Sequence, residues 1–232
     1  MQEENVLSRK WKILLALSGL IALLFSLSPN PLTMYPLFVL AYFFRDRLTL
    51  KSEKQRYLYF VIAIMLSSLL LEILAWLSNY VEANPEPILF HPQLIPDLLI
   101  AVGFYSAWAI TWTIALRRYN FTLPSLFITH GLYGVFIEQQ GAVFIAGLST
   151  FPVGIIFWLY VFLAYGSTMG LAYLPFRKLF KDEEKQQTRW KYLWVVLALF
   201  ILVYVTTFIF GLLWMSLGLI PEPGSIIERP FY

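Results

Sequence analysis

Two carboxylates and one imidazole lie inside long apolar stretches of the chain. Glu72 lies within residues 57–81, and His130 and Glu138 lie within residues 121–138. A charged carboxylate at the centre of a membrane helix costs ~3 kcal/mol on insertion scales, so such side chains face protein or water rather than lipid. Carboxyl and imidazole groups are common proton donors and acceptors in catalysis. We therefore predict that Glu72, Glu138 and His130 are catalytic acid–base groups of one polar site.

Further polar side chains are expected beside these three. Residues three or four positions apart share one face of a helix. This spacing gives three stripes that we expect to face one another: Ser68, Glu72, Ala75 and Asn79; Asp97, Ala101, Tyr105, Trp108, Thr111 and Trp112; and His130, Gly134, Glu138 and Gly141. The predicted substrate-binding residues come from these stripes and their flanks: His91, Asp97, Gln139, Tyr105 and Asn79.

The buried acids have no basic partner in the surrounding sequence, because the predicted membrane spans contain no Lys or Arg. Three states remain open for the carboxyls: they are protonated, they share one proton, or they bind a cation, a metal or a substrate amine. Mixed Glu, Asp and His ligands would suit a divalent metal. No compact metal-binding motif is present in the sequence, so the cofactor stays unassigned.

Each of these residues also has a purely structural interpretation. A protonated Glu72 or Glu138 could hydrogen-bond a neighbouring helix, and His130 could bind a backbone carbonyl. Asp97 stands at the start of a predicted helix, where the helix dipole favours a negative charge, and His91 could be an exposed loop residue. The glycines of the same region suit close helix packing: Gly131, Gly134 and Gly141.

The composition is that of a membrane protein. Of the 232 residues, 59% are hydrophobic and 13% are charged, whereas roughly 25% of the residues in a soluble domain are charged. Aromatic residues make up 18% of the chain, and Tyr and Trp favour membrane interfaces. The chain has no cysteine, which excludes disulfides, thiolate nucleophiles and cysteine-based metal sites.

The apolar stretches predict an all-α, polytopic helical bundle that forms one domain over residues 1–232. About seven transmembrane helices are expected, at residues 13–28, 32–44, 57–81, 96–116, 121–138, 152–174 and 192–218. The first two are shorter than the ~20 residues that usually span a bilayer, so one span plus an interfacial segment is the alternative to a hairpin. Residues 139–151 either extend the fifth helix or form a short re-entrant piece. The loop 82–95 is expected to cap the polar site, because prolines flank its apolar centre.

The basic residues predict the orientation. With seven spans and a cytoplasmic N-terminus, every Lys and Arg except Arg229 falls on the cytoplasmic side, as the positive-inside rule requires. The C-terminus is then extracytoplasmic. The net charge of +3 is explained by orientation, without a nucleic-acid partner. We expect a multi-pass protein of an inner or plasma membrane, with its intramembrane acids toward the outer face.

The sequence lacks familiar catalytic patterns. Residues 192–218 contain no Lys for a retinal Schiff base, and no His-Glu-x-x-His zinc motif is present. Three functions remain open: an enzyme acting on a lipid or isoprenoid at the outer leaflet, a structural or assembly subunit that binds another membrane protein, and a proton- or cation-coupled transporter. The enzyme needs a gap between helices that opens to the bilayer. The transporter needs polar groups that reach the inner face, and the subunit needs neither.

Overall fold

The computed structural model describes residues 8–50, 55–85, 87–180, 185 and 188–232, apart from the side chain of Gln139. Within these residues the regular structure is helical and no strand forms, as the sequence predicts. The helices are α1 (Arg9–Phe25), η1 (Pro31–Thr33), α2 (Met34–Phe43), α3 (Arg45–Leu48), α4 (Arg56–Val81), α5 (Leu94–Arg118), α6 (Leu123–Phe136), η2 (Glu138–Gly141), α7 (Ala142–Ser149), α8 (Gly154–Tyr173), η3 (Leu174–Phe176) and α9 (Trp190–Ser216).

Four helical segments are long and apolar enough to cross a membrane: α4, α5, the continuous segment Gly154–Phe176, and α9. The chain therefore has the construction of a helical membrane protein. The other apolar helices are shorter, and α6 has only 14 residues. At 1.5 Å per residue, 14 residues rise about 21 Å, which is less than the ~30 Å of a bilayer core.

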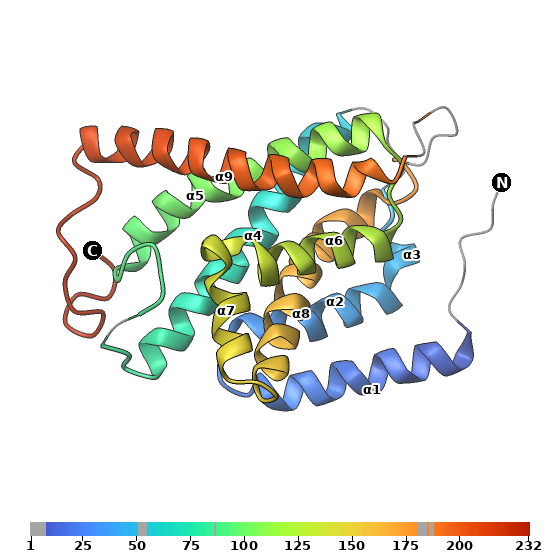
Figure 1. Ribbon diagram of the computed structural model, residues 1–232, viewed down its shortest axis with the longest axis horizontal. Helices are drawn as coiled ribbons and strands as arrows, with labels where there is room; N and C mark the ends of the chain where they lie inside the picture. The colour runs from blue at the N-terminus through green and yellow to red at the C-terminus, as the bar shows by residue number, and fades with distance from the viewer. Residues whose placement is uncertain (1–7, 51–54, 86, 181–184, 186–187) are drawn as a thin grey trace.

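Successive long helices run in opposite directions along the molecule (Figure 1). α5 packs along α9, α6 packs along α8, and α4 contacts both α5 and α8. α2 packs against the outside of α8, and α1 packs against α2. The main core forms between α4, α5, α6, α8 and α9. Five helices therefore enclose the polar residues that the sequence singles out.

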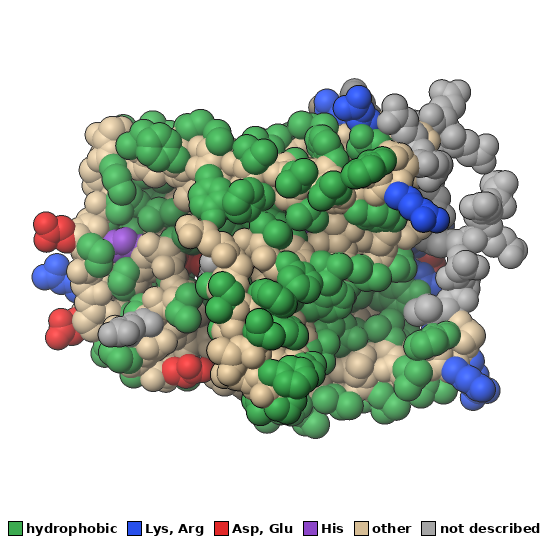
Figure 2. All heavy atoms as spheres, viewed as in Figure 1, with side chains coloured by type: hydrophobic (Ala, Val, Ile, Leu, Met, Phe, Trp, Pro, Cys, Tyr) green, Lys and Arg blue, Asp and Glu red, His purple; other side chains and the backbone are tan. Residues whose placement is uncertain are grey.

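The charged residues gather at the two ends of the molecule (Figure 2). In this view the Lys and Arg side chains lie mainly at the end where α1 starts, which we call the basic end. Most visible Asp and Glu side chains lie at the opposite end, where α9 finishes and which we call the acidic end. A broad apolar band separates the two ends.

The prediction of one continuous helix over residues 121–138 is wrong at its C-terminal end. α6 stops at Phe136, and Glu138 lies in the short turn η2. The chain reverses through Gln140 and Gly141, which have left-handed φ values of 59° and 80°; Gly141 adopts this conformation without a steric penalty. α7 then contacts both α6 and α8. Residues 139–151 thus do not extend the fifth predicted helix, and the helical stripe does not continue through Glu138 to Gly141.

The loop at the acidic end folds over the helices, as predicted. The Trp76 indole N–H on α4 donates a 2.9 Å hydrogen bond to the Pro92 carbonyl. The ring of Phe90 lies 5.1 Å from that of Phe104 on α5. These contacts hold the loop across α4 and α5. The helix α5 begins at Leu94, two positions earlier than predicted.

A glycine allows α5 and α9 to approach closely. A Cβ atom on Gly103 would lie 2.7 Å from the Phe210 Cβ and 3.1 Å from the Thr206 carbonyl oxygen. Gly211, also on α9, has no such atom within 4 Å. These two glycines therefore offer a matched test of the helix packing.

We expect Gly103→Ala to force α9 away from α5 and to lower the free energy of unfolding by ~1–3 kcal/mol, the usual range for overpacking. Gly211→Ala should be neutral or stabilising by up to ~1 kcal/mol, because Ala favours a helix more than Gly does. Thermal unfolding in detergent, followed by tryptophan fluorescence, measures both effects. Equal melting temperatures for the two variants would contradict this packing.

Candidate functional site

Glu72 on α4 and Asp97 on α5 form a pair of buried carboxyls near the acidic end. Glu72 is 7% exposed and Asp97 is fully buried, and the two side chains are close enough to interact directly. The Tyr105 hydroxyl donates a 2.5 Å hydrogen bond to Glu72 Oε2. Two adjacent carboxyls without a basic neighbour need a shared proton or a cation between them, because like charges that close repel strongly.

Asp97 is held by the loop as well as by its own helix. The backbone N–H of His91 donates a 3.0 Å hydrogen bond to Asp97 Oδ1. Asp97 Oδ2 is buried and has no hydrogen-bond partner among the described residues. The second oxygen of this carboxyl therefore remains available for a proton or a small ligand.

Glu138 forms a second acid site, between the end of α6 and α8. The Tyr165 hydroxyl donates a hydrogen bond to Glu138 Oε1, whereas Oε2 is buried and unpaired within the described part of the chain. Gly134 permits this arrangement, because a Cβ atom there would lie 2.7 Å from Cγ of the Tyr165 ring. The predicted role of this glycine in helix packing is confirmed, and the same contact places the tyrosine that holds the acid.

His130 on α6 is fully buried and lies among aromatic rings. The Trp112 indole N–H donates a 3.2 Å hydrogen bond to His130 Nδ1, so Nδ1 is an acceptor and the imidazole proton lies on Nε2. His130 Nε2 has no partner among the described residues. The structural alternative of a bond between His130 and a backbone carbonyl is not found among the described residues; the Trp112 indole is the partner of the ring instead.

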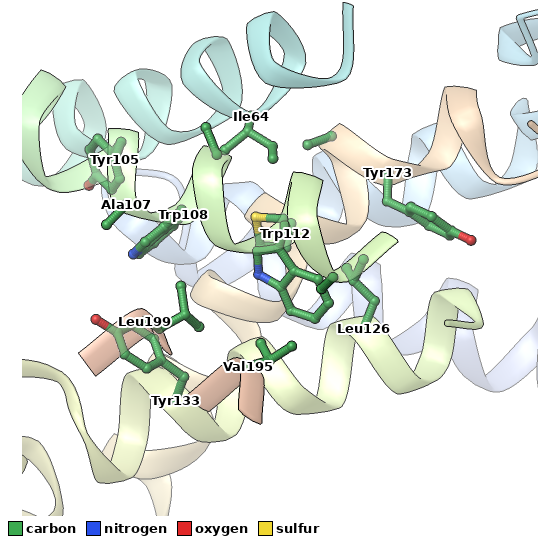
Figure 3. Packing of buried hydrophobic residues seen from close by; sticks show 14 of the residues in the cluster. Ile64, Tyr105, Ala107, Trp108, Trp112, Leu126, Tyr133, Tyr173, Val195 and Leu199 are labelled. Carbon is green, nitrogen blue, oxygen red and sulfur yellow. The ribbon is translucent and has the colours of Figure 1, made fainter. Parts of the chain in front are cut away.

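Aromatic side chains fill the space between the two acid sites. The ring of Trp108 lies 4.8 Å from Tyr105, 4.1 Å from His130 and 5.4 Å from Tyr165. Figure 3 shows Trp108 and Trp112 packed between Ile64 on α4 and Leu199 and Val195 on α9. Glu72 also contributes to the electrostatic potential at Glu138. The two acids therefore belong to one polar and aromatic cluster.

The buried face of α5 matches its predicted stripe. Its six members are all fully or almost fully buried: Asp97, Ala101, Tyr105, Trp108, Thr111 and Trp112. Asn79 on α4 bonds within its own segment: its amide donates to the Ala75 carbonyl, and its carbonyl oxygen accepts from Asn84. These bonds join it to the end of α4, and its substrate-binding role stays a prediction. The side chain of Gln139 lies outside the described residues.

The structure corrects the alternative interpretation of His91 as an exposed loop residue. The side chain is 4% exposed, and both ring nitrogens are engaged by backbone groups of the loop and tail. A ring held on both sides in this way cannot contact a substrate directly without first breaking one of these hydrogen bonds.

Tyr165 is the residue that sequence reasoning missed. It lies in a predicted span without any acid, and no helical stripe marks it. The only local signal is the run of small residues beside it, Ala164, Gly166 and Ser167, which permits close contact with other helices. Its role follows only from the packing of α6 against α8.

A metal centre has little support from the donor groups. Across the described residues, no group of three or more His, Asp or Glu side chains is arranged to hold a metal ion. Glu72 and Asp97 provide two adjacent carboxyls, and His130 is separated from them by the Trp108 ring. The cofactor therefore stays unassigned.

Two grooves lie along the line where α6 and α9 meet. The first, of about 420 Å³, is lined by Ser125, Ile128, Thr129, Leu132, Tyr192, Leu193 and Val196. The second, of about 360 Å³, lies farther toward the acidic end and is lined by Phe136, Ile137, Gln140, Phe200 and Tyr204. Glu138 does not line the second groove; Ile137, which does, directly precedes this acid in the chain.

No family model, curated protein or solved structure matches this chain. The predicted roles of Glu72, Glu138 and His130 therefore rest on geometry and chemistry alone.

We expect Tyr105→Phe to lower the free energy of unfolding by ~1–3 kcal/mol, because Glu72 Oε2 loses its donor inside the core. Tyr59→Phe in the first turn of α4 provides the control, since Tyr59 is exposed and its hydroxyl can be replaced without leaving a buried group unpaired. Unfolding in detergent measures both variants. A melting temperature of Tyr105→Phe at or above that of Tyr59→Phe would show that the buried bond contributes nothing.

Proposed function

We propose that this chain is an integral membrane enzyme that acts on a lipid or isoprenoid substrate. The observation that carries the proposal is the groove at α6 and α9, one of whose lining residues, Ile137, directly precedes Glu138, a buried acid with one oxygen unpaired within the described residues. Its lining residues Phe136, Phe200 and Tyr204 are 42–47% exposed. In a bilayer, such a groove opens to the lipid and would accept an apolar chain from the side.

The proposed chemistry assigns different roles to the acids. Glu138 would transfer a proton through Oε2, while Tyr165 holds Oε1 in place. Glu72, bound by Tyr105 and adjacent to Asp97, would supply or accept a proton at the other side of the cluster. His130 would donate a hydrogen bond from Nε2 to the substrate. Substrate-binding roles for Asp97 and Tyr105 are part of the same proposal.

The proposed arrangement in the membrane has seven crossings and places the acids toward the outer side. The alternating directions of α1, α2, α4, α5, α6, α8 and α9 support this count (Figure 1). The concentration of Lys and Arg at the basic end supports a cytoplasmic basic end (Figure 2). α2 and α6 would cross only where other helices shield their ends from lipid. The protein would then be a multi-pass component of an inner or plasma membrane.

A structural or assembly subunit is the second candidate. It is favoured by the tight packing around His130, whose ring lies 4.1 Å from Trp108 and is fully buried. In this case the acids and tyrosines would only lock the helices together. A proton- or cation-coupled transporter would use the same acids and would need polar groups that continue to the basic end.

Tags at Met1 and Tyr232 test the arrangement in the membrane. With an odd number of crossings, the two tags lie on opposite sides, and only the tag at Tyr232 is digested by protease added to intact cells. Digestion after permeabilisation provides the control that both tags are present. Protection of both tags in intact cells would rule out the seven-span arrangement.

Substitution of the acids tests the enzyme. Glu138→Gln and Glu72→Gln keep the side-chain shape and can still hydrogen-bond, so both proteins should fold, whereas loss of the proton-transfer group should reduce turnover by roughly 10²–10⁴-fold. Turnover is measured by mass spectrometry of membrane lipids as the change produced by expression of the wild-type chain. Glu82→Gln, at an exposed position, should retain that change. Folded acid variants that alter the lipids as the wild type does would favour the structural candidate.

A further inference from the structure

The tail after α9 forms a strap across the acidic end. The backbone N–H groups of Leu94 and Ile95 donate to the carbonyls of Pro230 and Phe231, at 3.0 and 3.2 Å. These N–H groups lie in the first turn of α5, where backbone N–H groups have no acceptor within their own helix. The tail therefore caps the helix that carries Asp97.

Side chains also hold the strap in place. The Phe231 ring stacks on Trp76 of α4 with 6.1 Å between centroids. Ile226 is 3% exposed, whereas its neighbour Ile227 is 49% exposed. The backbone N–H of Gly224 lies 3.4 Å from Gln93 Oε1. The strap is thus packed over the loop and over the ends of α4 and α5.

His91 connects the loop to the strap, and its hydrogen bonds define its tautomer. The backbone N–H of Gln93 can only donate, so His91 Nδ1 accepts this bond, at 3.2 Å. The imidazole proton then lies on Nε2, which donates to the Pro221 carbonyl at 3.1 Å. This pair of bonds requires a neutral imidazole. A proton added to Nδ1 would place two donors face to face.

We propose that His91 is a pH-sensitive latch that releases the C-terminal strap as the outer side becomes acidic. Histidine is the side chain whose ordinary titration falls between pH 5 and 8. Protonation removes the acceptor for the Gln93 N–H, and the ring must move to separate the two donors; we expect this movement to disrupt the bond from Nε2 to the Pro221 carbonyl. The change in charge state thus acts directly on a bond within the loop and, through movement of the ring, on a bond that joins the loop to the strap.

The charged groups around His91 come from α5, α4 and the strap. Asp97 on α5 accepts the His91 backbone N–H, and Glu72 on α4 lies behind it. The charged residues of the strap are all exposed: Glu222, Glu228 and Arg229.

Release of the strap would open the Glu72–Asp97 pair to water. The His91 backbone N–H and the capped first turn of α5 both hold Asp97 in its present position. This inference is independent of the proposed enzyme activity, because it concerns only access to the acid pair. The same latch would regulate an enzyme or a transporter.

Paired cysteine variants of the full chain in lipid nanodiscs test the latch. The chain has no cysteine of its own, so Ile226→Cys reports the buried face of the strap and Ile227→Cys its exposed face. A maleimide reagent labels each variant at pH 7.5 and pH 5.5. At each pH, the labelling rate of Ile226→Cys is divided by that of Ile227→Cys, which removes the effect of pH on thiol reactivity. We expect this ratio to rise about tenfold at pH 5.5, the effect of losing roughly one net hydrogen bond.

His91 variants provide the control. His91→Asn keeps an acceptor near Nδ1, and His91→Gln keeps a donor near Nε2, but neither gains charge, so both should give a ratio that does not depend on pH. Hydrogen exchange of the Leu94 and Ile95 amides in the unmodified protein, corrected for intrinsic rates, should accelerate at pH 5.5. A flat ratio in the wild-type background, or the same pH dependence in His91→Asn, overturns the proposal.

Discussion

Buried acids without basic partners are the constraint on which the arrangement of this bundle depends. Two of these acids are each held by a tyrosine from a different helix: Glu72 on α4 by Tyr105 on α5, and Glu138 after α6 by Tyr165 on α8. A buried polar group without a partner costs ~1–3 kcal/mol, so separating either helix pair would be unfavourable. Because apolar side chains distinguish poorly between a helix and lipid, these bonds specify which helices are neighbours.

At the basic end, buried cations are likewise held by partners from other segments of the chain. Arg177 is almost fully buried, and its guanidinium donates to the carbonyls of Arg45 and Leu174 and forms an ion pair with Asp46. Lys191, at the start of α9, donates to the Asn120 carbonyl at 2.5 Å. Carbonyl groups at helix C-termini attract positive charge. The basic residues that predict orientation therefore also join neighbouring segments at this end.

Helical spacing was sufficient to predict the buried face of α5, but not the turn after α6, the strap or the position of Tyr165. The stripe on α5 follows from periodicity, because a regular helix of 25 residues keeps its register from Asp97 to Trp112. α6 departs from its prediction because left-handed residues at 140 and 141 turn the chain, and no pattern of apolar residues reports that turn. The strap is similarly hidden, since its bonds use backbone groups that carry no sequence signal. Tyr165 becomes recognisable only once α6 and α8 are placed side by side.

Eight other buried side-chain atoms of the described residues also lack a partner, so it is the titratable nature of the three unpaired groups of the site that favours a binding site over a purely structural cluster. A set of residues whose only role is to hold helices together is most stable when every buried polar atom has a partner. Here Glu138 Oε2, His130 Nε2 and Asp97 Oδ2 are buried without one in the described residues, although the other polar atom of each side chain is bound. Each side chain is thus oriented by one atom and keeps its second atom free. This division of roles is what a group needs to meet a proton or a substrate, and it is the reason that we favour a chemical function over a purely structural one.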